Sequence, residues 1–472
     1  MENSSDIARL FGAQQAAALA SVQASSLAER KAALARFQAA FDRHRAALVA
    51  AVGRDMAKPE TEAMIWEMLP IQAEISHARR HLRRWMRGQG AWPTLSTLGT
   101  SARVRPEPRG LALIIAPWNF PVLLSLGPVI SALAAGNRVV LKPSEATPET
   151  SKALAAMLAE AFPPEEVAVV QGGAEVSQAL LDLPFDHIFF TGGTEIGRLV
   201  MAKAARTLAS VTLELGGKSP TIIGPGADIA KAARWVVWGR MSNAGQTCVA
   251  PDHVFVPRAL FDGFAEALRT EIAVRYGSDT AAQKASRDFG RIVNDRHFAR
   301  VAGLLEDARA KGASVLAGGE VDAAERFIAP TVLTDTSAGM AVSQEEIFGP
   351  LLPLIAYDDV TEVLTRINAA PRPLALYIFD KDRAFVDRMI GATRSGSVGV
   401  NLSVIQFIHA NLPFGGIGAS GQGTAHGFAG FAAFSHMRPV LTNRLSALPM
   451  LFPPYGTFVR RVVAVFGRLL RL

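Results

Sequence analysis

The sequence predicts an α/β protein built around a parallel β-sheet. Between residues 111 and 197, short apolar runs of strand length alternate with segments of helical spacing, which is the pattern of consecutive βαβ units. The runs are continuously apolar, as in Leu111–Ile115, and this is typical of strands covered on both faces. With 472 residues, 49% hydrophobic and 19% charged, the chain has the length and mix of an enzyme with several structural units.

Composition argues against several other classes of protein. The net charge of +7 and the pI of 9.7 are basic, but the charge is thinly spread and no aromatic–basic module occurs, so we expect no nucleic-acid partner. Residues 1–6 lack the features of a secretory signal, and no apolar run reaches the ~18 residues of a membrane span. We therefore expect a cytoplasmic protein.

Helices are expected to precede the sheet. Residues 7–86 have helical spacing, with Pro59 and Pro70 as the expected boundaries. At about 100° per residue, five arginines share one face of the helix expected near its end: Arg79, Arg80, Arg83, Arg84 and Arg87. A solvated basic face is the simpler interpretation, and contact with an anion or a membrane is the alternative. Residues 88–110, rich in Gly and Pro, predict an irregular or extended connector.

Strands and helices then alternate along the chain. Strands are expected over 111–115, 138–141, 167–170, 187–190, 211–213 and 221–223. Helices are expected up to Ala135, closed by Gly136, then over 151–161, 176–181 and 229–242, with a further one beginning in 191–197. Residues 413–421 are too rich in glycine for either element and predict a tightly folded loop.

The chain contains a single cysteine, Cys248, so an intrachain disulfide and a thiolate metal cluster are both excluded. A lone cysteine is usually a small buried hydrophobic residue. Here, however, Asn, Gly, Gln and Thr crowd its N-terminal side, which indicates a loop that enters an apolar segment. A thiolate beside backbone N–H groups is a strong nucleophile near neutral pH, so Cys248 is a candidate catalytic residue.

Polar residues at strand ends suggest a ligand at one edge of the sheet. The loop at 191–197 opens onto a helix, where glycines and free N–H groups suit a phosphate, although it does not match the common G-x-G-x-x-G pattern. Lys142 and Glu145 follow an earlier strand, and could hold ribose hydroxyls or form a surface ion pair. Glu214 could act as a general base and Asn119 could donate to an oxyanion, but each could also be structural.

Taken together, these stretches resemble the aldehyde dehydrogenase superfamily. The motifs occur in the family's order between residue 117 and about 430: Pro117-Trp118-Asn119-Phe120-Pro121, Lys142-Pro143-Ser144-Glu145, Phe190-Thr191-Gly192-Gly193-Thr194, Glu214-Leu215-Gly216-Gly217-Lys218, Gly245-Gln246-Thr247-Cys248, Glu345-Glu346-Ile347-Phe348-Gly349-Pro350 and Pro413-Phe414-Gly415-Gly416. The short N-terminus and residues 248–252 look most like the class 3 branch, which includes fatty, aromatic and coniferyl aldehyde dehydrogenases.

The resemblance implies a fold and its division. It implies a Rossmann-like NAD-binding domain over 1–93 and 107–216 and an α/β catalytic domain over 217–420. A small bridging and oligomerisation element would comprise 94–106 and 421–445, leaving 446–472 as a tail. A homodimer is expected.

It also implies residue roles. Cys248 would be the nucleophile, Glu214 the base for deacylation and Asn119 an oxyanion-hole donor. The expected cofactor is NAD, with NADP also accepted, and no metal is expected. The residues expected to bind the cofactor are Trp118, Lys142, Glu145, Gly192, Gly193, Thr194, Gly197, Glu346 and Phe348.

The implied reaction is oxidation of an aliphatic or aromatic aldehyde to the carboxylic acid, through a thiohemiacetal and a thioester on Cys248. An acyl-thioester or acyl-phosphate reductase is one alternative, but such relatives need not keep the base at Glu214. A non-catalytic binding protein on the same fold is the other. Many relatives have Ser where this chain has Gly193, and class 3 relatives tend to carry Asp and His where it has Leu402 and Gln406.

The end of the chain predicts a basic amphipathic helix. Residues 457–472 carry four arginines within an arc of ~100° and apolar residues around the rest, without an acidic residue. Such a helix can lie in the interface of an anionic membrane, which would suit a long-chain aldehyde delivered from lipid. Packing on this chain or on a partner subunit is the alternative.

Overall fold

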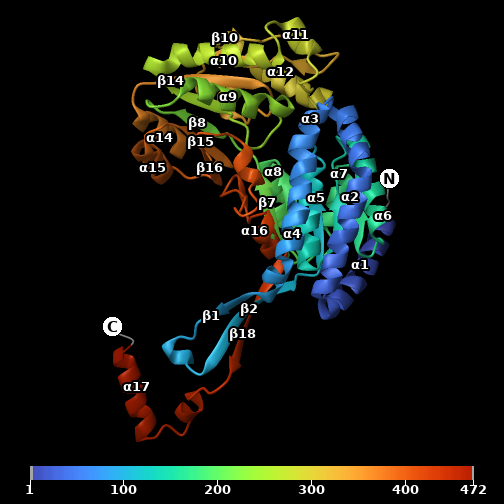
Figure 1. The fold of residues 1–472 in the computed structure, drawn as a ribbon, viewed down its shortest axis with the longest axis vertical. Coiled ribbons are helices and arrows are strands. Elements are labelled where there is room, and N and C mark those ends of the chain that lie inside the picture. Colours follow the sequence, from blue (N-terminus) through green and yellow to red (C-terminus); the bar gives the residue numbers. More distant parts are fainter. Residues whose placement is uncertain (1–3, 470–472) are drawn as a thin grey trace.

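Two large sheets and a small projecting one organise the computed structural model, which describes residues 4–469 (Figure 1). Helices from the first part of the chain cover the six-stranded sheet, and the seven-stranded sheet with its own helices forms the other lobe. The α/β class expected from the sequence is confirmed. The three-stranded sheet extends away from both lobes like an arm.

The N-terminal helices form one nearly continuous layer. Their bounds are α1 (Ser4–Ala24), α2 (Leu27–Met56), α3 (Glu60–Ala63) and α4 (Leu69–Arg87), and a π-helical segment, η1 (Met64–Met68), joins the last two. Pro59 precedes α3 as expected. Pro70 stands in the first turn of α4, as expected, but the helical path is not broken there: the N–H group of Leu69 bonds to Met64 O, five residues back, so a widened turn joins α4 to the segment before it. The five arginines of α4 are exposed, as a solvated basic face requires.

The six-stranded sheet has the order β17-β7-β6-β3-β4-β5, in which all but β17 run parallel. The strands are β3 (Leu111–Ile115), β4 (Arg138–Lys142), β5 (Val167–Val169), β6 (His187–Gly192), β7 (Ser210–Leu215) and β17 (Gly421–Gln422). The helices are α5 (Leu123–Ala135), α6 (Pro148–Ala161), α7 (Ala174–Leu181), α8 (Thr194–Ala204) and α16 (Gly427–Ala433). The chain runs outward from β3 to β5 and then returns to β6, so its direction across the sheet reverses at β3, where ligands of such sheets bind.

The seven-stranded sheet has the order β10-β13-β14-β9-β8-β15-β16, with only β10 antiparallel. Its strands are β8 (Pro220–Ile223), β9 (His253–Pro257), β10 (Ser314–Ala317), β13 (Thr331–Thr334), β14 (Leu351–Tyr357), β15 (Ala375–Phe379) and β16 (Ser397–Val400). Its helices are α9 (Ile229–Met241), α10 (Phe261–Tyr276), α11 (Thr280–Ala285), α12 (Asp295–Ala310), α13 (Ala341–Gln344), α14 (Val360–Ala369) and α15 (Arg383–Ala392). β11 (Val321–Asp322) and β12 (Phe327–Ile328) form a separate hairpin. Short 3₁₀ turns include Ser242–Gly245 and Ile405–Ile408.

The arm consists of β1 (Gln89–Ala91), β2 (Thr100–Pro108) and β18 (Ser435–Asn443). Much of the connector expected over 88–110 is therefore regular strand. The bridging element expected over 94–106 and 421–445 differs from this sheet in its bounds. The expected element begins after β1 and so leaves this strand out. It also includes β17, which pairs with β7, and α16, which packs on α4 and α5; both belong to the larger body.

The expected C-terminal helix is present as α17 (Thr457–Leu469), beyond the arm (Figure 1). Its apolar face is only partly covered by the rest of the chain: Phe458, Val463 and Val465 are each more than half exposed, whereas Val459 is buried. Leu470, Arg471 and Leu472 lie outside the described residues. Across residues 4–469, no helix is both long and apolar enough to cross a membrane.

Candidate active site

The nucleophile candidate follows a sharply folded turn between the two lobes. After α9, Asn243, Ala244 and Gly245 have φ angles of 54°, 51° and 75°, so the chain turns through three consecutive left-handed residues. At Gly245 a Cβ atom would lie 2.2 Å from Gly349 O, which only glycine avoids. The turn delivers Cys248, half-buried, to an apolar cluster.

The surroundings of Cys248 favour the neutral thiol. Burial raises the pKa of the thiol to about 12, and the charges of Glu346 and Glu214 raise it further, while the backbone N–H groups of Cys248 and Val249 act in the opposite direction. The two carboxyl groups therefore lie close enough to influence the sulfur. At neutral pH the thiol is protonated in this state, so a nucleophilic role requires a group that takes its proton.

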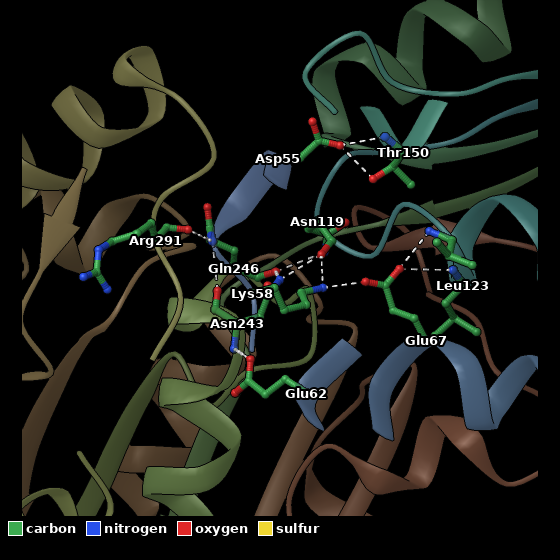
Figure 2. A network of polar contacts seen from close by, with 11 residues as sticks. Asp55, Lys58, Glu62, Glu67, Asn119, Leu123, Thr150, Asn243, Gln246 and Arg291 are labelled. Atoms are coloured by element: carbon green, nitrogen blue, oxygen red, sulfur yellow. Dashed lines mark hydrogen bonds and ion pairs between the residues drawn. The ribbon is translucent and has the colours of Figure 1, made fainter. Parts of the chain in front are cut away.

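Asn119 is fastened to the same turn by side-chain amides (Figure 2). It follows β3, is 3% exposed, and its Nδ2 donates to Gln246 O at 3.2 Å. In return, Asn243 Nδ2 donates to Asn119 O at 2.9 Å and to Gln246 O at 3.0 Å. The side chain of Asn119 is thus bonded to a residue two positions before Cys248 in the chain. Its second amide N–H takes no part in these hydrogen bonds.

The Gln246 side chain secures the turn from the opposite side. Its Nε2 donates to Asn243 O at 2.9 Å and to Arg291 O at 3.0 Å, and its Oε1 accepts from Val293 N at 3.0 Å. Glu62 also accepts from the backbone N–H of Asn243, at 3.0 Å. Both lobes therefore determine the path of the chain leading to the thiol.

Glu214 lies at the carboxyl end of β7 and is 4% exposed. Thr191 Oγ1 donates to its Oε2 at 3.5 Å, while Oε1 has no hydrogen-bond partner within residues 4–469. Burial raises the pKa of Glu214 to about 8, and the Thr191 bond opposes this only in part. Such a carboxyl can accept a proton from a weak acid, as a general base must.

Glu346 and Phe348 reach the junction between the sheets. The Glu346 carboxylate folds against the segment joining β7 to β8, where a Cβ at Gly216 would lie 2.2 Å from its Oε2. Burial raises the pKa of Glu346 to about 7, and the backbone N–H of Gly217 works against this. Phe348, at φ 46°, meets the Trp118 ring edge-on with centroids 5.3 Å apart. The centroid of the His297 ring lies 4.7 Å from that of the Trp118 ring.

The remaining predicted cofactor residues surround the strand ends of the six-stranded sheet. Lys142 Nζ contacts Glu145 Oε2 at 2.6 Å; the lysine side chain is 3% exposed and the glutamate 56%. At the start of α8 no side chain caps Gly193, and a Cβ there would meet nothing within 4 Å, so this helix end is open to a ligand.

Two predicted loop residues also have structural explanations. A Cβ at Gly197 would lie 2.6 Å from Leu215, so this glycine lets α8 approach β7. Thr194 Oγ1 donates to Ala419 O at 3.0 Å, which ties the helix start to the glycine-rich loop. The close packing of α8 on β7 is therefore sufficient to explain a glycine at position 197, and phosphate binding is not needed to explain it.

The sequence did not single out the aromatic group around Trp66. Trp66, in the π-helical segment, lies 4.7 Å from Trp238 and 6.0 Å from Phe407 between ring centroids. All three rings pack in the cluster that Cys248 borders. Aromatic residues scattered over three elements carry no local signal, so only the fold could bring them together.

The departures at Leu402 and Gln406 lie close to the nucleophile. Gln406 Nε2 donates to Tyr377 OH at 3.1 Å, and Tyr377 OH donates to Val249 O at 2.5 Å. Leu402 packs near the Tyr377 ring beside Gly399. Gln406 therefore replaces a titratable side chain with an amide that holds the residue after Cys248 through one tyrosine.

Comparison with known proteins supports the resemblance. The model of the aldehyde dehydrogenase family matches residues 2–440. A protein named "Probable coniferyl aldehyde dehydrogenase" from Caulobacter vibrioides is 43% identical and is aligned over 89% of this chain and 88% of its own. "Aldehyde dehydrogenase family 3 member A2" of Rattus norvegicus is 41% identical over 86% and 83% of the two chains.

Solved structures agree with the fold. Staphylococcus aureus AldH, in a substrate-bound state, superposes with a TM-score of 0.92 at 34% identity, covering 99% of this chain and 100% of that one. A Mycobacterium tuberculosis aldehyde dehydrogenase complexed with NAD⁺ has a TM-score of 0.82 at 28% identity, covering 94% and 91%.

The buried carboxyl of Glu214 is expected to lower stability at alkaline pH. Because its pKa in the folded state, about 8, exceeds the ordinary value of 4.5, the folded protein binds the proton more tightly, and stability is lost as pH rises between these values. Glu214→Gln cannot ionise. The melting temperature of this variant minus that of the native protein should therefore increase as the pH rises from 5 to 9.

The effect of groups that titrate in both proteins cancels when one melting temperature is subtracted from the other. Glu266→Gln, at a side chain that is 67% exposed, provides the matched control and should follow the native curve. Parallel melting curves for Glu214→Gln and the native protein would mean that Glu214 is ionised in the fold at neutral pH.

Proposed function

The chain belongs to the aldehyde dehydrogenase family, an oxidoreductase family that converts aldehydes to acids, and we propose that it does so through Cys248 with a nicotinamide cofactor. The proposed reaction is RCHO + NAD⁺ + H₂O → RCOO⁻ + NADH + 2 H⁺. One observation carries it: Asn119 is hydrogen-bonded to the turn that bears Cys248, while the charge of Glu214 acts on the same sulfur.

The residues divide the chemistry as follows. Cys248 releases its proton to solvent water and adds to the aldehyde carbon, and the amide of Asn119 donates to the resulting oxyanion. Collapse of the oxyanion expels the hydride and leaves a thioester on Cys248. Glu214 then takes a proton from water, which attacks the thioester and releases the acid. An acyl-thioester reductase has no need of this last step, so the presence of Glu214 favours oxidation.

The protonation states suit this order of events. With a pKa of about 8, Glu214 is mostly neutral near pH 7, and its ionised fraction grows as pH rises. While Glu214 is neutral, it places no negative charge beside the Cys248 thiolate. It ionises and acts as a base once a water molecule reaches it. We therefore expect the rate of thioester hydrolysis to increase with pH toward a plateau above pH 8.

The residues present fit a dinucleotide. The uncapped start of α8 at Gly192–Gly193 suits a pyrophosphate, and Lys142 with Glu145 suits a ribose. Trp118, Glu346 and Phe348 would hold the nicotinamide half. When bound, the nicotinamide supplies the acceptor for the hydride. Lack of a side chain at Gly193 leaves phosphate binding to backbone N–H groups.

The proposed substrates are aromatic or medium- to long-chain aliphatic aldehydes. Cys248 borders the large apolar core, which also contains Trp66, Trp238 and Phe407, and rings of this kind offer large flat contact surfaces without charge. The name of the Caulobacter relative, a coniferyl aldehyde dehydrogenase, agrees with an aromatic substrate.

We also propose a homodimer and a peripheral membrane contact. The arm stands clear of both lobes and offers Trp92, 94% exposed, and Leu441, 59% exposed, to a second subunit. The apolar face of α17 is partly exposed, and Arg460, Arg461 and Arg468 lie beside it, which suits an anionic interface.

Removal of the base should separate the two halves of the reaction. Glu214→Gln is expected to form NADH once per active site and then stall, because hydrolysis of the thioester slows by ~10²–10⁴. Rapid mixing with hexanal, decanal and benzaldehyde measures this burst. Cys248→Ser is the control and should form no NADH with any aldehyde, since a serine hydroxyl ionises far less readily. Turnover by the serine variant would exclude the covalent mechanism.

The carboxylate at the ribose site is expected to set cofactor preference. Glu145 can accept from a 2′-OH but repels a 2′-phosphate, so NAD should be preferred while NADP is still used. Glu145→Gln should shift the ratio of kcat/KM toward NADP by about fivefold to tenfold, since two nearby charges in water interact by ~1 kcal/mol. An equal ratio in both proteins would exclude Glu145 from cofactor selection.

Removing α17 should abolish membrane binding if the helix is the contact. A chain ending at Tyr455 is expected to lose co-sedimentation with anionic liposomes, whereas the full chain binds anionic but not neutral vesicles. Aldehyde oxidation in solution should be unchanged. Equal sedimentation of both chains would contradict the membrane proposal, and dissociation of the dimer on truncation would show that α17 packs on the partner.

A further inference from the structure

Lys58 is a buried lysine at a turn between helices. α2 ends at Met56, Ala57 takes the left-handed conformation at φ 47°, and Pro59 starts the next helix. This short turn directs Lys58 inward, where its side chain is 1% exposed. A charge so far from water is retained only where protein groups replace its hydration.

Three groups surround the Lys58 ammonium, and Figure 2 shows two of them, Glu67 and Asn119. Nζ donates to Glu67 Oε1 at 2.7 Å and to Asn119 O at 3.1 Å, and it lies 4.3 Å from the centre of the Phe120 ring. An ammonium has three N–H donors, so these partners use its full capacity. Two of the three belong to the segment that bears the proposed oxyanion donor.

Glu67 completes the contact from the other side. It sits in the π-helical segment and is fully buried, and its Oε2 accepts from the backbone N–H groups of Val122, at 2.8 Å, and Leu123, at 3.4 Å. These groups stand at the N-terminal end of α5. Glu67 thus binds the end of the Asn119 segment directly and its beginning through Lys58.

We propose that Lys58 and Glu67 are positioning residues for Asn119. The pair clamps residues 119–123 at both ends, and the carbonyl of Asn119 is left with one other donor, Asn243. Without Lys58, rotation of this peptide would move the amide that faces the Cys248 turn. The inference rests on the proposed function, in which Asn119 stabilises the oxyanion.

The chain provides a matched control in Asp55. This buried carboxylate also caps a helix, since it accepts from Glu149 N at 3.2 Å and from Thr150 N at 2.8 Å at the start of α6 (Figure 2). It contacts neither Lys58 nor Asn119. Asp55→Asn therefore disturbs a buried helix cap on the same sheet without touching the proposed oxyanion donor.

The test is a double-mutant cycle between Lys58→Met and Asn119→Ala, read from the rate of the first NADH formed. Asn119→Ala should slow this step by ~10²–10³, the loss typical of one oxyanion donor. Lys58→Met should slow it by about tenfold to a hundredfold, as a small misplacement does. The double variant should be no slower than Asn119→Ala alone, because Lys58 acts only through Asn119. Asp55→Asn should retain the native rate.

Two further readouts separate positioning from general damage. Cys248 is the single cysteine, so its alkylation by iodoacetamide, followed by mass spectrometry, reports on the nucleophile turn alone. NADH binding, followed by tryptophan fluorescence, reports on the cofactor site. Both should match the native protein in Lys58→Met. If that variant does not fold, Lys58→Met combined with Glu67→Gln keeps the cap on Val122, leaves no buried charge and should show the same loss.

Particular results would overturn the proposal. Full additivity of Lys58→Met and Asn119→Ala, or a native rate in Lys58→Met, would show that Lys58 does not position Asn119. A native rate in Asn119→Ala would instead remove the oxyanion role from the proposed function itself. Equal losses in Asp55→Asn and Glu67→Gln would assign both carboxylates to fold stability.

Discussion

The amide hydrogen bonds of the nucleophile turn are the constraint on which the site depends. Gln246 joins the turn to Arg291 and Val293 in one lobe, while Asn243 joins it to Asn119 in the other. The bonds to Val293 and Asn119 are buried and the one to Arg291 is partly buried. Loss of a buried bond leaves an unsatisfied polar group and therefore costs more than at a surface. Three left-handed residues keep their strained conformation because this network surrounds them. The relative position of the two lobes and the path of the Cys248 loop are thereby determined together.

Burial of carboxyl groups gives the site its proton chemistry and lowers its stability. Glu214 and Glu346 both have a raised pKa because water is excluded from them, and both act on the thiol. Replacement by neutral groups would relieve this unfavourable desolvation, so neither carboxyl group is explained by fold stability. By contrast, the buried pair of Lys58 and Glu67 is internally compensated and serves geometry. The protein thus contains two kinds of buried carboxyl group: Glu67, which is paired with a cation, and Glu214 and Glu346, whose burial raises their pKa.

The sheet and the motif-bearing loops could be predicted from sequence, because apolar runs and glycine clusters are local signals. All six strands expected between 111 and 223 are present, within one or two residues of their expected ends. The aromatic group around Trp66 could not be predicted, since its rings come from three distant segments. Lys58 gave no signal either, because its partners are a carboxylate nine residues away and a backbone carbonyl 61 residues away. Pro70 marks the start of α4 as expected, but no local pattern indicated the π turn that joins this helix to the segment before it.

That π turn also decides which face of the following helix meets the core. It fits one residue more into a turn than an α-helix does, so α4 keeps the phase it would have if that residue were missing. Deletion of one residue within Met64–Met68 would therefore restore regular α-helical hydrogen bonds and leave the arginine face of α4 exposed. The same deletion inside α4 would rotate the rest of the helix by about 100° and turn arginines toward its neighbours. A change of length in this layer should thus be tolerated at the π turn and not within α4.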